Sequence, residues 1–260
     1  MIAEEEDFVT RAKQLKAPNL FLALAEPSRA MLEASTLPWG VAALSRVPKG
    51  DGHPVLVIPG FTASDLSTVP LRRFLEQKNY TVHPWRMGRN LGMIHEFIPK
   101  LEQRVVDIAE EYGEKVTIIG QSLGGIYARE VARACGDVVR QVITLGSPFG
   151  GAAEGCNVVW VYDAVTGEKI RLRPADFFET IASPPPVPST AIFSKTDGIA
   201  SWKTCIEMPS DWTDNIEILG SHCGMGFNPV VLFAIADRLA QAEDEWSPFD
   251  RGGWRRAFFR

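Results

Sequence analysis

The sequence has few cysteines, few histidines, no long apolar run and no strong net charge. The four cysteines are scattered, and this pattern fits neither a disulfide scaffold nor a zinc site. No apolar run approaches the length of a membrane span. The formal net charge of −5 lacks the positive field that a nucleic-acid partner requires. These absences argue against a disulfide-rich domain, a membrane-spanning protein and a nucleic-acid-binding protein.

The first 25 residues do not have the charge pattern of a secretion signal. The stretch Leu20–Ala25 ends in an A-x-A pattern, but it is short for a signal core, and acidic residues rather than basic ones precede it. We therefore expect a cytoplasmic protein with reduced thiols. Cys205 and Cys223 both lie on loops near the candidate site described below, so a disulfide between them remains open at this point.

The rest of the composition is that of an ordinary globular protein, with 45% hydrophobic and 23% charged residues in a chain of 260. Short apolar runs without alternation follow one another, separated by helical patterns, which is typical of strands covered on both faces. We predict an α/β fold with a mostly parallel central sheet flanked by helices. The predicted strands are Val55–Ile58, Tyr80–His83, Val116–Ile119, Gln141–Leu145, Ala191–Phe193 and Ile216–Leu219.

We expect a single domain over residues 1–260 with three additions to its core. Residues 1–50 form an N-terminal helical segment, in which Pro27 and Pro38 each end a helix. Residues 149–189 interrupt the alternation and are predicted to form a cap, with a hairpin around Thr166-Gly167. Residues 246–260 form a basic, aromatic tail; such a tail suits a membrane surface, but one weak patch seldom anchors a protein.

One hexapeptide carries the main candidate for catalysis. It lies between a predicted strand and a predicted helix and reads Gly120-Gln121-Ser122-Leu123-Gly124-Gly125. A G-x-S-x-G pattern in this setting is a nucleophile elbow, a sharp turn that presents a serine hydroxyl. Its glycines allow the strand and the helix to approach closely. The pattern therefore predicts Ser122 as a nucleophile.

A serine nucleophile needs a base, and a base needs a carboxylate to hold its tautomer. Of the four histidines, His222 follows a late predicted strand on a loop, whereas His53 precedes its strand and His95 lies near a helix start. His83 follows a strand but comes early in the chain. Asp197 follows the strand Ala191–Phe193, while its rivals suit turns or caps; these rivals are Asp163, Asp211 and Asp214.

An acyl-transfer reaction also needs two donors for the oxyanion of its tetrahedral intermediate. The backbone N–H of Leu123, next to the nucleophile, is the first candidate. The second is the N–H of Phe61, on the loop after the first strand, where Gly60 permits a tight approach. Phe61 could alternatively only line a turn.

In the order Ser122, Asp197, His222 on an alternating chain, the sequence resembles the α/β-hydrolase fold from about Pro54 to Leu239. The motifs are similar to those of a bacterial esterase and lipase group; they are Pro59-Gly60-Phe61, the loop Trp85 to Gly92, Gly120 to Gly125, Ser194 to Gly198 and Gly220-Ser-His. The chain has no HGGG stretch, so its oxyanion loop resembles the short Gly-Phe kind. The resemblance implies a carboxylic ester hydrolase.

We therefore predict hydrolysis of small-molecule esters through an acyl-enzyme, with no cofactor and no metal. The predicted cap is rich in apolar residues, which favours an apolar acyl or alcohol group; these residues are Val158, Val159, Trp160, Phe177 and Phe178. An alternative is that they only pack the cap onto the sheet. Acyl transfer or thioester hydrolysis on the same triad is an alternative, and so is a binding protein without catalysis. The sequence leaves the oligomeric state and the acyl chain length open.

Overall fold

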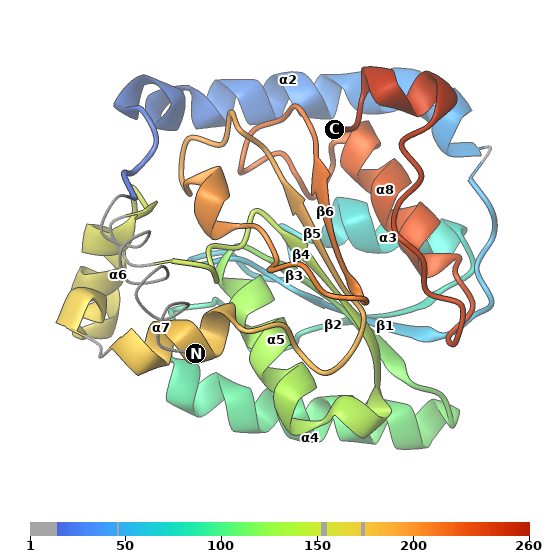
Figure 1. The fold of residues 1–260 in the computed structure, drawn as a ribbon, viewed down its shortest axis with the longest axis horizontal. Helices are drawn as coiled ribbons and strands as arrows, with labels where there is room; N and C mark the ends of the chain where they lie inside the picture. The colour runs from blue at the N-terminus through green and yellow to red at the C-terminus, as the bar shows by residue number, and fades with distance from the viewer. Residues whose placement is uncertain (1–14, 46, 152–154, 173–174) are drawn as a thin grey trace.

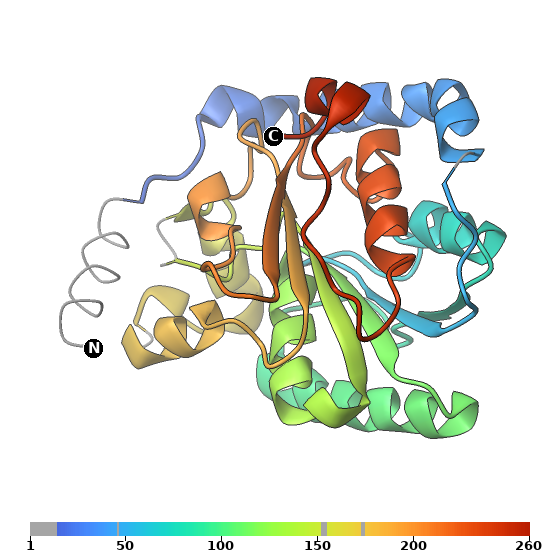
Figure 2. The ribbon, with the colours of Figure 1, turned by 45° about the vertical axis from the view of Figure 1, so that its right-hand side comes forward.

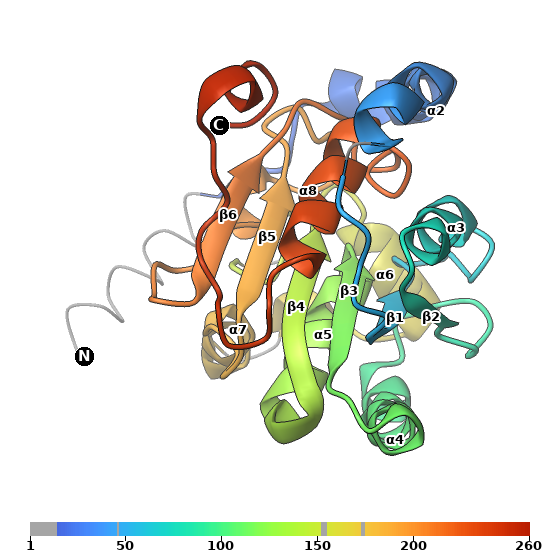
Figure 3. The same cartoon turned by 90° about the vertical axis from the view of Figure 1, so that its right-hand side faces the viewer.

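The computed structural model describes residues 15–45, 47–151, 155–172 and 175–260. Its centre is a sheet of six strands in the order β2-β1-β3-β4-β5-β6, and every neighbouring pair is parallel (Figure 3). The strands are β1 (Pro54–Ile58), β2 (Thr81–Pro84), β3 (Val116–Gln121), β4 (Val139–Leu145), β5 (Ser189–Phe193) and β6 (Thr213–Glu217). All residues of β1 and β5 are buried, as the unalternated runs predicted.

Helices cover both faces of this sheet, which confirms the predicted α/β fold with a parallel central sheet flanked by helices (Figures 1 and 2). On one face, α4 (Ile94–Tyr112) and α5 (Leu123–Ala134) share an apolar core with β1, β3 and β4. On the other face, α3 (Val69–Gln77) and α8 (Pro229–Leu239) build a second core. Gly113 ends α4 in the left-handed conformation, and Asn228 caps α8 by accepting from the Val230 N–H.

The N-terminal segment differs from the prediction, because α2 (Leu20–Ser45) is one helix that continues through both Pro27 and Pro38. A proline inside a helix removes one backbone donor and usually kinks or ends the helix. Here α2 lies across the molecule above the carboxyl ends of β5 and β6 (Figure 1), and polar side chains bind it to the loops there. Tertiary contacts have therefore overridden the local signal. The first 14 residues of the predicted N-terminal segment lie outside the described residues.

The segment 149–189 is helical, so the predicted hairpin is wrong. It contains α6 (Val159–Thr166), the 3-10 turn η3 (Ile170–Leu172) and α7 (Ala175–Ala182). Gly167 has φ 72° and ends α6 as a left-handed cap, rather than turning a hairpin. The apolar run that suggested a strand buries Val159 and Tyr162, three residues apart, while Trp160 is 72% exposed.

The C-terminal tail folds back on the domain. Phe249 and Phe259 are buried against α8, and a short 3-10 helix, η5 (Gly253–Ala257), lies between them. Arg260 and Glu217 exchange backbone hydrogen bonds of 3.1 and 3.2 Å, so the last residue extends the edge at β6. Among the described residues, no helix combines the length and hydropathy that crossing a membrane would need.

Candidate active site

Ser122 stands at a strained turn between β3 and α5, with φ 51° and ψ −123°. This region of backbone space is costly for a residue with a side chain, so the surroundings must enforce it. A methyl group added at Gly120 would lie 2.3 Å from the Gly124 carbonyl oxygen, and one at Gly124 would lie 2.6 Å from the Ile58 carbonyl oxygen. Both glycines are thus required for the close approach that forces the turn.

Hydrogen bonds to neighbouring segments fix the same turn. The Ser122 N–H donates to the Leu145 carbonyl at the end of β4, at 2.9 Å. The Ser147 hydroxyl donates to the Ser122 carbonyl at 2.5 Å. On the other side, a methyl group at Gly60 would lie 3.2 Å from Ser122 Cβ, so the loop after β1 passes directly beside the serine.

Asp197 and His222 form a buried pair, with 2.6 Å between Asp197 Oδ2 and His222 Nδ1. Their exposed fractions are 3% and 7%. The other carboxylate oxygen of Asp197 accepts from the N–H groups of Ile199 and Ala200, at 2.7 and 2.8 Å. These two bonds hold the carboxylate in place, and the pair leaves Nε2 as the imidazole atom that can act on a substrate.

Burial alone would lower the pKa of His222, but the neighbouring Asp197 carboxylate outweighs it by charge and by hydrogen bonding, and Glu26 adds a smaller contribution. The net result is a pKa raised above the ordinary value of 6.5. The site therefore favours the imidazolium form more than water does, which is what a base needs at the moment it accepts a proton.

Gly146 lies beside this pair, and the residue before it, Leu145, accepts the hydrogen bond from the Ser122 N–H. Gly146 follows β4 directly, and a methyl group there would lie 3.1 Å from both Asp197 Oδ2 and His222 Nδ1. Gly146 has φ 54°, so this position suits glycine on conformational grounds as well. The Gln121 side chain donates to the His222 carbonyl at 3.1 Å, which ties the histidine loop to the elbow. The structure thus gathers Ser122, Asp197 and His222 at one edge of the sheet.

The rejected candidates lie elsewhere or have other partners. His53 is buried between Asp51 and Thr117 at the amino ends of the strands, opposite the serine. Asp163 accepts from the Ile170 N–H, and Asp214 pairs with Arg251. Further, Cys156 lies on the pocket wall described below, but burial raises its pKa to about 12, so it is a thiol rather than a nucleophilic thiolate at neutral pH. All four cysteines are unbonded, including Cys205 and Cys223.

Phe61 and Leu123, the predicted oxyanion donors, lie beside the serine on the same pocket. Leu123 begins α5, so its N–H belongs to the helix terminus, where backbone donors have no partner within the helix. Within the described ranges, neither the Phe61 nor the Leu123 N–H donates to a protein acceptor. Thr62 next to Phe61 has φ 60° and donates to the Asn90 carbonyl at 2.7 Å, which fixes the loop.

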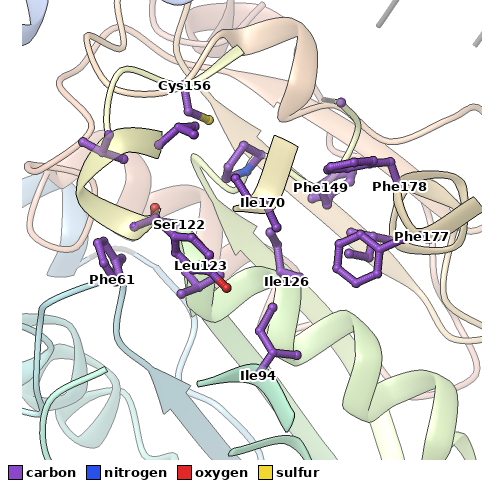
Figure 4. A pocket seen from close by; sticks show the side chains of 16 residues that line it. Phe61, Ile94, Ser122, Leu123, Ile126, Phe149, Cys156, Ile170, Phe177 and Phe178 are labelled. Atoms are coloured by element: carbon purple, nitrogen blue, oxygen red, sulfur yellow. The ribbon is translucent and has the colours of Figure 1, made fainter. Parts of the chain in front are cut away.

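An apolar pocket of about 760 Å³, counting the part that opens to solvent, adjoins Ser122. Figure 4 shows Phe61, Ser122 and Leu123 along one side of it and Phe149, Phe177 and Phe178 along the other. Its walls are almost entirely apolar, as are those of most small-molecule sites. Val158, Val159, Phe177 and Phe178 contribute as predicted, whereas Trp160 does not line the pocket.

Several residues that shape the site were missed at the level of sequence. Gln121 lies inside the hexapeptide, but nothing in the pattern indicates that it reaches the histidine loop. Glu26 of α2 contacts the loops of both Asp197 and His222, at a separation in sequence that no local pattern reveals. No cluster of three or more His, Cys, Asp or Glu residues suited to a metal occurs in the described part of the chain.

Comparison with known families shows to which family the chain belongs. The family model described as palmitoyl protein thioesterase matches residues 54–184, just over half of the chain. The chain belongs to the palmitoyl protein thioesterase family. The match includes the loop of Phe61, the elbow and the helices α6 and α7, and it ends before β5 and the loops of Asp197 and His222. It also places the chain in the α/β-hydrolase superfamily.

Solved structures of low identity share the fold. Lipase B of Aspergillus fumigatus has a TM-score of 0.57 at 19% identity, over 73% of this chain and 53% of that one. The monoacylglycerol lipase of Paleococcus ferrophilus has a TM-score of 0.53 at 15% identity, over 74% and 95% of the two chains. A Bacillus licheniformis lipase has a TM-score of 0.53 at 14% identity, over 75% and 95%. The chain thus matches about half the length of the Aspergillus lipase.

Among curated proteins, no sequence matches the chain significantly.

Proposed function

We propose that the protein is a serine hydrolase that cleaves acyl esters through an acyl-enzyme, with the acyl chain in the apolar pocket. One observation carries the proposal: a buried Asp197–His222 pair with a 2.6 Å hydrogen bond at the sheet edge where Ser122 occupies a strained elbow. Membership of the palmitoyl protein thioesterase family and the lipase folds of the structural neighbours support the same reaction class.

In the proposed reaction, His222 Nε2 takes the proton of Ser122 as the hydroxyl oxygen attacks the acyl carbon. Asp197 holds the imidazole in place and stabilises the imidazolium. The Phe61 and Leu123 N–H groups donate to the oxyanion of the tetrahedral intermediate. The imidazolium then protonates the leaving group, and water, activated by the same histidine, releases the acid from Ser122. The helices α6 and α7 act as the cap that excludes water from the acyl chain.

Thioester hydrolysis is the second candidate, and the family match favours it. The acyl-enzyme is the same, and only the leaving group changes from an alcohol to a thiol. The oxyanion site and the acyl pocket bind parts that both substrates share, so this geometry serves either one. Turnover of an acyl ester and an acyl thioester of the same chain length would rank these two candidate functions. Because deacylation is the same step for both substrates, a difference in turnover reflects the step in which the leaving group departs.

The test of the proposal is Ser122→Ala. We expect this variant to keep its fold and stability and to lose turnover of p-nitrophenyl esters and acyl thioesters by about three orders of magnitude or more, because the nucleophile is gone. A fluorophosphonate probe should label the wild type and not the variant. Turnover or labelling at the wild-type level in Ser122→Ala would contradict the proposal.

A further inference from the structure

Helix α2 contacts the two loops that carry Asp197 and His222, although it lies far from both in sequence. Three of its side chains face these loops, at the helical spacing that places them on one side; they are Glu26, Arg29 and Glu33. The outer surface of the same helix is different, since Leu24, Met31 and Leu32 are each more than two-thirds exposed. Helix α2 therefore packs against the rest of the domain through its polar side.

Glu26 connects the two loops directly. Its Oε1 accepts from the N–H of Gly198, the residue after Asp197, and its Oε2 accepts from the N–H of Cys223, the residue after His222, both at 2.9 Å. Glu26 as a whole is 1% exposed, so these charge-assisted bonds are protected from water. One carboxylate thus sets the separation between the backbones of the acid and the base.

Arg29 and Glu33 strengthen the same junction. Arg29 donates to the Thr196 carbonyl at 2.6 Å and to the Gly220 carbonyl at 2.9 Å, again one bond to each loop. Glu33 accepts from the Ser221 N–H at 2.6 Å. Together with Glu26, these side chains form hydrogen bonds to the two residues that flank Asp197 and to the two residues that flank His222. A packed helix carrying three such groups is a rigid support, of the kind that precise catalytic geometry requires.

The backbone of α2 also lies against the acid loop. A methyl group added at Gly198 would lie 2.4 Å from the Leu22 carbonyl carbon and 2.6 Å from the Ala23 nitrogen. This approach leaves no space for a side chain at Gly198. Contact this close, together with the Glu26 bond to the same residue, means that the position of the acid loop depends on the position of α2.

We infer that Glu26 is a positioning residue for the proposed reaction, which holds Asp197 and His222 in register by bonding both of their loops from helix α2. This inference rests on the serine hydrolase function proposed above. In this role α2 supports the active site, and Glu26 does not itself contact the substrate.

The first test is Glu26→Gln, which keeps one acceptor oxygen and places an amide donor against the other backbone N–H. One loop then loses its bond, and kcat should fall by about 10- to 100-fold while KM stays within about twofold, because misplaced catalytic groups affect the chemical step. The ion pair of Lys115 and Glu243 lies at the opposite end of the sheet, so Glu243→Gln is the matched control and should keep wild-type kcat.

A pH profile separates positioning from a general loss of structure. The charged groups around the imidazole are Asp197, Glu26, Arg29 and Glu33, with the Cys223 thiol beside them. Removal of the Glu26 charge should shift the acidic limb of kcat/KM to lower pH, since that charge helps to raise the pKa of His222. A variant that was merely less stable would lose activity without moving this limb.

The outcomes distinguish this inference from the proposed function. Wild-type kcat and an unmoved acidic limb in folded Glu26→Gln, alongside an inactive Ser122→Ala, would overturn the positioning role and leave the hydrolase function standing. An active Ser122→Ala would overturn the function itself. If Glu26→Gln does not fold, Glu33→Gln tests the base loop alone; a smaller loss of kcat at constant KM supports the inference, and wild-type kcat contradicts it.

Discussion

The behaviour of His222 follows from two opposed influences on one side chain. Burial disfavours the charged imidazolium, while Asp197 at 2.6 Å favours it, and the carboxylate prevails so that the pKa is raised. In the proposed reaction His222 is the base, and a base must be neutral before it can accept the serine proton. The raised pKa therefore moves the loss of activity on the acid side to higher pH than an ordinary histidine would give.

We expect kcat/KM of the wild type to fall as pH decreases through the pKa of His222, with a midpoint above 6.5. Asp197→Asn removes the dominant charge and leaves the burial, so the midpoint should shift to lower pH, and kcat should fall by about three to four orders of magnitude. Steady-state profiles from pH 4 to about 9 measure both effects, because this range brackets histidine titration. A midpoint that Asp197→Asn leaves in place would show that another group controls the acid limb.

At the scale of the helix and strand, the sequence patterns that gave correct predictions are those whose effect depends only on neighbouring residues. The glycines of the elbow and the unalternated strands each act within a few residues. The break predicted at Pro27 was wrong because Glu26 and Arg29 bind α2 to loops about 170 to 200 residues away. Such contacts outweigh a local preference, and no single-sequence pattern contains them.

Arg129 is a second long-range contact that the sequence does not reveal. It stands among the small residues of α5, is fully buried, and forms an ion pair with Glu207. It also donates to the Ala182 and Ser183 carbonyls at 3.1 and 2.7 Å, where α7 ends. A cation at these carbonyls satisfies groups that the helix leaves unpaired. The arginine thus fastens α7 to α5.

We expect Arg129→Met to lower the free energy of unfolding by about 3 to 5 kcal/mol, because it leaves the Glu207 carboxylate buried without its partner. Adding Glu207→Leu should restore much of that loss, since both charges are then absent. Lys115→Met breaks an exposed pair with Glu243 and should cost less than about 1 kcal/mol. Denaturant unfolding of the wild type and the three variants measures these differences, and equal losses in Arg129→Met and Lys115→Met would refute the role of burial.

Over the whole molecule, the parallel topology explains why residues from five separate segments meet at one site. Parallel strands place all their carboxyl ends on one edge, so the loops after β1, β3, β4, β5 and β6 converge there. The position of Ser122, Asp197 and His222 after their strands could therefore be predicted from order alone. The pocket could not, because its walls combine α4, α5 and the α6–α7 segment, whose packing no periodicity specifies.

The chain-length preference should follow from how these distant elements enclose the pocket. Ile126 on α5 lines it between Leu123, beside Ser122, and the phenylalanines of α7 (Figure 4). Ile126→Trp fills space that a long acyl chain would occupy, so we expect kcat/KM for esters with long chains to fall by about 10-fold or more, while short acetyl and butyryl esters change little.

Trp160→Ala is the matched control, because Trp160 lies on α6 with 72% of its surface exposed and does not line the pocket. It should leave the ratio of long-chain to short-chain turnover unchanged. The measurement is kcat/KM over a series of p-nitrophenyl esters for the wild type and both variants. A uniform loss across the series in Ile126→Trp would mean that the acyl chain lies outside this pocket, because a blocked site discriminates by length and a distorted one does not.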